Sequence, residues 1–125
     1  MTRDVVTCSP DEPLLAVVNM LATKKFSCLV IVEDKAPLGI VTERDLVEVL
    51  FDTLQGVTWS ELPIGNFMTS PVVTVTEDIT LDDLVMMSHL KKIRHMPVVN
   101  ELGELIGIIT QSNIIAGFYQ STDLS

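Results

Sequence analysis

An internal repeat constrains the fold of this chain more than any other feature of its sequence. The stretch GIVTERDL at residues 39–46 returns as GIITQSNI at residues 107–114, and Met1-Thr2 returns as Met68-Thr69. Matches that keep their order and spacing along the chain are typical of a duplication. Each copy has only roughly 50 residues, which is a small number for an independent core. We therefore expect the two copies to pack their apolar faces together about a pseudo-twofold axis.

Each copy has the same predicted order of elements. The β-branched segments VVTC and VVTV predict short strands. The next segments, SPDEPLLAVVNMLATKK and TEDITLDDLVMMSHLKK, begin with acidic and capping residues and end with lysines, as a helix dipole favours. Two apolar strands follow in each copy, CLVIVE with LGIVT and MPVVNE with LIGIIT, with turns expected around residues 35–37 and 101–103.

A last helix completes each copy. The segment ERDLVEVLFDTLQ predicts a helix that Gly56 ends, and QSNIIAGFY predicts a shorter counterpart. Pro63 and Gly65 mark a connector. The sequence thus predicts an α/β (α+β) fold of two β-α-β-β-α repeats, with repeat 1 at residues 1–55, the connector at 56–67 and repeat 2 at 68–125.

Composition narrows the class of protein. The chain has 125 residues, of which 47% are apolar, so a folded core is expected. Its formal net charge of −9 argues against nucleic acid or an anionic membrane surface as the partner. No apolar run approaches the ~18 residues of a membrane span, and Met1 leads directly into a strand-like segment, so no signal peptide is expected. Cys8 and Cys28 lie in apolar surroundings, which favours reduced thiols and a cytoplasmic protein.

The duplicated pattern resembles a tandem pair of CBS domains, also called a Bateman module. The supporting motifs are FMTSPVVTV at residues 67–75, RHMPVV at residues 94–99 and the two G-x-x-T segments, and the resemblance covers essentially the whole chain. It implies that adenosine-containing ligands bind in clefts between the repeats. It also implies a regulatory role without catalysis, and a homodimer formed through the helical faces.

Thr42 and Asp45 are the first candidate binding residues. A carboxylate can accept two hydrogen bonds from a ribose diol, and a threonine hydroxyl at a helix start lies where phosphate is favoured. The same residues also suit a purely structural role. Thr42 can cap the helix, and Glu43 and Asp45 can complement its dipole. These residues alone leave both roles open.

The resemblance also implies that basic residues just before the apolar strand of one repeat meet a phosphate held by the other repeat. Cleft one would then combine Thr42 and Asp45 with Arg94 and His95, and Arg44 would be a further cation. Arg94 and His95 could instead only complement the dipole of the preceding helix. Apolar residues would line the adenine slot of cleft one: Val6, Ile40, Met96 and Pro97.

Cleft two would be the weaker site. It would combine Thr110 and Asn113 with Ser27 and Cys28, so an amide replaces the carboxylate and neutral groups replace the cations. The expected ligand is AMP, ADP or ATP in cleft one, with an S-adenosyl compound as the alternative. No cofactor is required by this interpretation.

Two other classes of function are alternatives to ligand sensing. No H-x-x-x-H pair, C-x-x-C motif or nucleophile elbow is present, so we expect neither catalytic residues nor a metal site. A ligand-free dimerisation or protein-interaction module is the second alternative, because the segments LVEVLF and IIAGFY are apolar. The abrupt start of the first repeat also suits a sensor that acts on an attached or separate effector domain.

Overall fold

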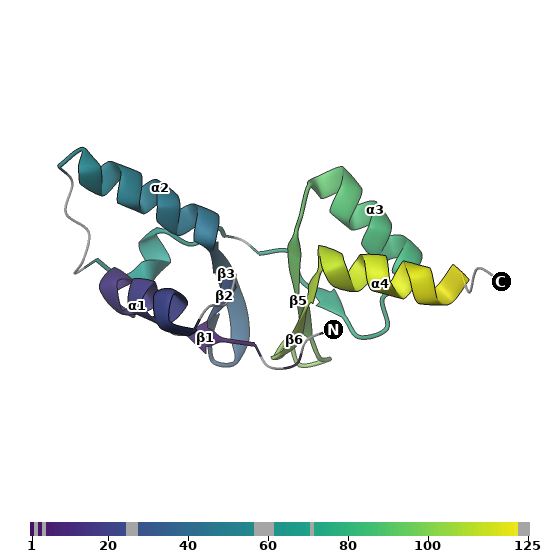
Figure 1. Cartoon of the computed structure of the whole chain (residues 1–125). Coiled ribbons are helices and arrows are strands. Elements are labelled where there is room, and N and C mark those ends of the chain that lie inside the picture. The colour runs from purple at the N-terminus through teal and green to yellow at the C-terminus, as the bar shows by residue number, and fades with distance from the viewer. Residues whose placement is uncertain (2, 4, 25–27, 57–61, 71, 123–125) are drawn as a thin grey trace. The chain divides into compact units, whose positions relative to one another are not determined.

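The computed structural model describes residues 1, 3, 5–24, 28–56, 62–70 and 72–122 (Figure 1). The chain forms two compact units. The first unit is Val6–Val72, and the second is Val73–Ser125 together with Met1–Val5. We describe each unit by itself. The boundaries that the sequence predicts for the two repeats, at residues 55 and 68, remain predictions.

The first unit contains a three-stranded sheet in the order β1-β2-β3, with β1 parallel and β3 antiparallel to β2. Gly56 follows α2 at a φ of 94°, a left-handed conformation that favours glycine, so the predicted helix end is confirmed. The elements are β1 (Thr7–Cys8), α1 (Leu14–Lys24), β2 (Cys28–Glu33), β3 (Ala36–Thr42) and α2 (Glu43–Leu54).

The core of the first unit follows from the spacing of its apolar residues. Helix α1 buries Leu14, Val17 and Leu21, which recur at the three- and four-residue intervals of one helix face. Leu29 and Ile31 of β2 pack in the same core and are fully buried. Strand β2 is the middle strand of the sheet, and the burial of Val30 between Leu29 and Ile31 shows that both of its faces are covered.

The segment after α2 belongs to this core. A short 3-10 helix, η1 (Ile64–Asn66), places Ile64 fully buried among the core residues. The Ile64 amide donates to the Glu12 carbonyl at 2.7 Å, and the Leu14 amide donates to the Leu62 carbonyl at 2.8 Å. The second of these bonds satisfies a backbone donor at the start of α1, where a helix has no internal acceptor to offer.

The second unit has the same topology, with the sheet order β4-β5-β6 and the same strand directions. Its core contains Val75, Leu84, Met96, Val98, Ile109 and Ile114. The elements are β4 (Val75–Thr76), α3 (Leu81–Lys91), β5 (His95–Val99), β6 (Leu105–Thr110) and α4 (Gln111–Thr122). The mixed α+β fold is therefore confirmed, and so is the β-α-β-β-α order of elements, which occurs once in each unit.

Two local predictions were wrong. Helix α4 has 12 residues, as α2 does, and is not the shorter of the two. The predicted segment QSNIIAGFY ends at Tyr119, whereas α4 packs on α3 and continues to Thr122. The first hairpin turn lies at Asp34 and Lys35, whose φ values are 51° and 68°, so β3 begins before Pro37.

No helix in the described part of the chain is both long enough and apolar enough to cross a membrane.

Candidate functional site

Thr42 and Asp45 form a capping box at the start of α2. The Thr42 amide donates to Asp45 Oδ2 at 2.9 Å, and the Asp45 amide donates to Thr42 Oγ1 at 3.4 Å. The Thr42 hydroxyl also donates to Asp45 Oδ2 at 3.2 Å. The capping role that the sequence left open is therefore confirmed. Asp45 Oδ1 accepts no hydrogen bond from any residue that the structure describes, so one carboxylate oxygen stays available to a ligand.

Thr110 and Asn113 repeat this arrangement at the start of α4. The Thr110 amide donates to Asn113 Oδ1 at 3.0 Å, and the Asn113 amide donates to Thr110 Oγ1 at 3.3 Å. An asparagine supplies the cap as well as an aspartate does, because a single side-chain oxygen is enough. The two repeats thus share the same helix cap. They differ in the side-chain group that takes no part in the cap, which is a carboxylate oxygen in Asp45 and an NH₂ group in Asn113.

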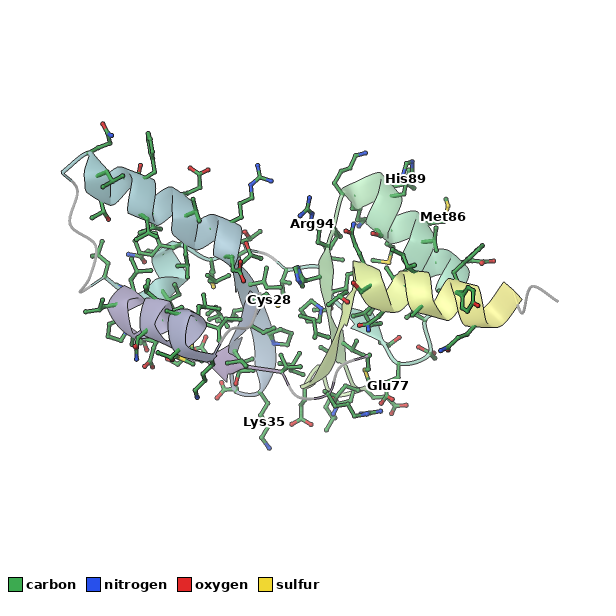
Figure 2. All side chains as sticks on the ribbon, viewed as in Figure 1. Cys28, Lys35, Glu77, Met86, His89 and Arg94 are labelled. Carbon is green, nitrogen blue, oxygen red and sulfur yellow. The ribbon has the colours of Figure 1, made fainter. Side chains whose placement is uncertain are left out.

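Arg94 and His95 lie beside the start of α4 within the second unit. The Gln111 amide donates to the Arg94 carbonyl at 3.2 Å, and His95 pairs with Thr110 in the sheet. Figure 2 shows the Arg94 side chain near the His95 end of β5. Burial lowers the pKa of His95, and the adjacent Arg94 lowers it further. At neutral pH the imidazole is therefore uncharged, and Arg94 carries the positive charge of the pair.

Cys28 occupies the corresponding place in the first unit. It pairs with Thr42 as His95 pairs with Thr110. Burial raises the pKa of Cys28 to about 11, so the thiol stays protonated and neutral. Burial and Glu12 together raise the pKa of Cys8 to about 11, and both cysteines are free. Ser27, which was predicted to contribute to cleft two together with Cys28, falls outside the described residues.

The predicted adenine-slot residues are mostly interior. Met96 is fully buried in the core of the second unit, which is a structural role. Ile40 and Pro97 are also buried, and Val6 is half-buried against the core of the first unit. Arg44 is exposed on α2 and makes no ion pair with any described residue.

A surface hollow of about 340 Å³ lies elsewhere in the second unit. Its acidic side chains repel a phosphate, so it does not suit a nucleotide. No group of three His, Cys, Asp or Glu residues in the described part of the chain could hold a metal ion. The hollow is lined by Thr76, Glu77, Asp78, Val99, Asn100 and Glu101.

Comparison with protein families decides the identity of the repeat. The CBS domain matches residues 1–52 and matches again at residues 64–119. The chain belongs to the CBS-domain family. It is a CBS pair, with one domain for each copy of the sequence repeat.

Relatives place the CBS pair within longer proteins. An uncharacterized protein of Methanopyrus kandleri, MK0525, is 38% identical over 114 residues, which are 90% of this chain and 57% of that protein. Inosine-5'-monophosphate dehydrogenase of Thermoplasma acidophilum is 34% identical over 113 residues, 90% of this chain and 21% of the enzyme. The chain thus spans about half of one relative and a fifth of the other. Because the match covers only about a fifth of the dehydrogenase, it does not assign that enzyme's activity to this chain.

A solved structure, CBSX2 in complex with AMP, has the same fold. It is 28% identical, with a TM-score of 0.77, over 94% of this chain and 88% of that chain.

Proposed function

We propose that this CBS pair is a regulatory module that binds an adenine nucleotide, AMP, ADP or ATP, without turning it over. The observation that carries the proposal is the Asp45 carboxylate, which is held in place by the α2 cap while Oδ1 remains available. A free carboxylate oxygen suits the hydroxyl groups of a ribose. The AMP bound to CBSX2, a protein of the same fold, supports the same ligand class.

We assign each part of the nucleotide to residues of this chain. Asp45 Oδ1 accepts hydrogen bonds from the ribose, and Arg94 donates to the phosphate with its planar guanidinium. His95, uncharged at neutral pH, adds a hydrogen bond but no charge. Thr42 contributes less than its position suggests, because its hydroxyl proton is already donated to Asp45. We further propose that nucleotide binding regulates an effector, attached or separate, and that the free thiols reflect a cytoplasmic location.

Calorimetric titration with AMP, ADP, ATP and S-adenosylmethionine tests this function. We expect an adenine nucleotide to bind, and Arg94→Ala to weaken AMP binding by about tenfold or more, since a charged hydrogen bond contributes about 1.5–3 kcal/mol. Adenosine, which lacks the phosphate, should be affected much less. The matched control is Arg3→Ala, because Arg3 is exposed and pairs with Glu77 at 3.2 Å.

The outcome that contradicts the proposal is equally specific. Binding of none of the four ligands, or an equal loss of AMP and adenosine in Arg94→Ala, would refute the assignment. Release of phosphate from ATP by the purified chain would refute a purely regulatory role.

We also propose that the chain is a homodimer, and a specific observation supports this assembly function beside ligand binding. Helices α2 and α4 expose large apolar side chains, which a soluble chain does not usually gather on its surface. These side chains are Val47, Leu50, Phe51 and Leu54 on α2, and Ile115, Phe118 and Tyr119 on α4.

Light scattering checks the dimer. We expect a dimer mass for the wild type and a shift toward monomer for Phe51→Glu. Leu102→Glu is the matched control, because Leu102 is a large apolar residue that is even more exposed than Phe51 but lies in a turn. A monomer mass for the wild type at every concentration would rule the dimer out.

A further inference from the structure

Helix α2 surrounds its exposed apolar residues with negative charge. Glu43 lies one helical turn before Val47, Glu48 follows Val47 directly, and both glutamates are exposed. Acidic residues in α2 outnumber its one cation, Arg44, by four to one. Two copies of α2 that faced each other would therefore bring like charges together, which disfavours that pairing. The exposed apolar residues form the α2 stripe: Val47, Leu50, Phe51 and Leu54.

Helix α4 has an exposed apolar stripe without any charge. Ile115 is 70% exposed, and Phe118 and Tyr119 follow it at three- and four-residue intervals, on the same face of the helix. The helix contains no Asp, Glu, Lys or Arg between Gln111 and Thr122. The α4 stripe, which consists of Ile115, Phe118 and Tyr119, can thus meet a second apolar surface without repulsion between charges.

The part of the second unit next to α4 is basic. Residues 84–100 include three Lys or Arg and two His but no acidic residue, although the whole chain has 17 acidic residues and only 8 Lys and Arg. The bond from the Gln111 amide to the Arg94 carbonyl holds this segment at the start of α4, and α3 packs on α4. Figure 2 shows His89 on α3 and Arg94 beyond the end of that helix. The surface around α4 is therefore complementary in charge to that around α2.

We propose that the α2 stripe of one chain packs on the α4 stripe of a second copy. This inference rests on the proposed homodimer and adds which helix meets which. In a dimer with twofold symmetry the contact of α2 with the partner's α4 forms twice, so both stripes are covered. The alternative dimer joins α2 to α2 and α4 to α4, and it gathers the acidic residues of both α2 helices at one contact. Charge complementarity selects the first arrangement.

The sign of a charge placed in the α4 stripe tests this pairing. Ile115→Lys and Ile115→Glu remove the same apolar side chain, and lysine and glutamate have similar helix propensities. Opposite α2 the lysine is attracted by acidic residues and the glutamate is repelled. We expect both variants to dimerise more weakly than the wild type. The dimer dissociation constant of Ile115→Glu should exceed that of Ile115→Lys by about fivefold or more, because the contact occurs twice.

Analytical ultracentrifugation of the full chain at low salt measures these dissociation constants. Leu102→Lys and Leu102→Glu are the matched controls, because Leu102 is exposed in a turn of the second unit. They measure how far a change in the net charge of −9 alters dimerisation by itself. The preference for lysine at Ile115 should exceed that at Leu102, and high salt should reduce it by screening. Phe118→Lys and Phe118→Glu form a second pair, with the same expected order.

The possible failures are distinguishable. A contact between two α4 helices would weaken Ile115→Lys and Ile115→Glu equally or favour the glutamate, because the neighbouring segment is basic. Either result overturns the pairing of α2 with α4 and leaves the homodimer in place. A wild-type dimer that neither substitution weakens also overturns it, because α4 then lies outside the interface. If the wild type is a monomer at every concentration, the proposed homodimer fails and this inference fails with it.

Discussion

Ile64→Ala is expected to lower the free energy of unfolding by about 3 kcal/mol, within the usual range for removing a large aliphatic side chain from a core. Ile64 is fully buried in the core of the first unit. Truncation removes its apolar contacts and leaves a cavity that the surrounding β-sheet and α1 can fill only in part. The effect is notable because the sequence places Ile64 in a connector, where an alanine would be tolerated.

Urea unfolding measures this loss. The matched control is Leu62→Ala, because Leu62 lies in the same segment but keeps 38% of its surface exposed. The bond from the Leu14 amide to the Leu62 carbonyl involves only backbone atoms and persists in the control. A loss below about 0.5 kcal/mol for Ile64→Ala, the size of an ordinary surface substitution, would show that this segment is not part of the core.

Gly39→Ala is expected to destabilise the first unit by about 2–3 kcal/mol, the cost of forcing atoms into a filled space. A Cβ at Gly39 would lie 2.8 Å from the Thr69 carbonyl oxygen and 2.6 Å from Met68 Sδ. The Met68 side chain can move away, but the carbonyl is backbone. It accepts from the Ile40 amide at 3.1 Å, and the Thr69 amide donates back to Ile40 at 2.9 Å.

The measurement is urea unfolding combined with hydrogen exchange at the Ile40 and Thr69 amides, both of which should exchange faster in the variant. Gly117→Ala is the matched control. Gly117 lies within α4, and a Cβ there would meet only Leu81 Cδ1 of α3, at 3.6 Å. Alanine there should stabilise the protein by about 0.5–1 kcal/mol. Unchanged stability and exchange in Gly39→Ala would mean that the segment around Thr69 does not pair with β3.

Both predictions concern residues 62–70, which the sequence marked only as a connector and the lead-in to the second repeat. The structure makes this segment part of the first unit through the buried Ile64 side chain and through backbone hydrogen bonds to β3 and to the region before and at the start of α1. These contacts have no local signature, because Thr69 pairs with Ile40 and the Ile64 amide bonds to the Glu12 carbonyl, which lie far away in the chain. A single sequence indicates element boundaries through residues such as Pro63. It does not show which core a nearby apolar residue such as Ile64 enters.

The order of elements could be predicted because it depends on local patterns. Apolar spacing, capping residues and Gly56 act over a few positions, and the duplication supplied an internal check on each element. The junctions at Thr42 and Thr110 were identified for the same reason. The length of α4 was underestimated because its last turn, which ends at Thr122, lies beyond the apolar segment that ends at Tyr119.

The candidate site also has features that the sequence determined and features that only the tertiary structure decided. The sequence by itself determined that Asp45 and Asn113 occupy equivalent positions. It also predicted that the amide of Asn113 makes the second repeat the weaker nucleotide-binding site. Only the tertiary structure decided which atom each side chain commits to its cap, and hence which atom is left for a ligand. It also decided that His95 is uncharged at neutral pH, since burial lowers its pKa. Composition and periodicity specify residue types along the chain, whereas hydrogen-bond direction and burial depend on where the folded backbone places each neighbour.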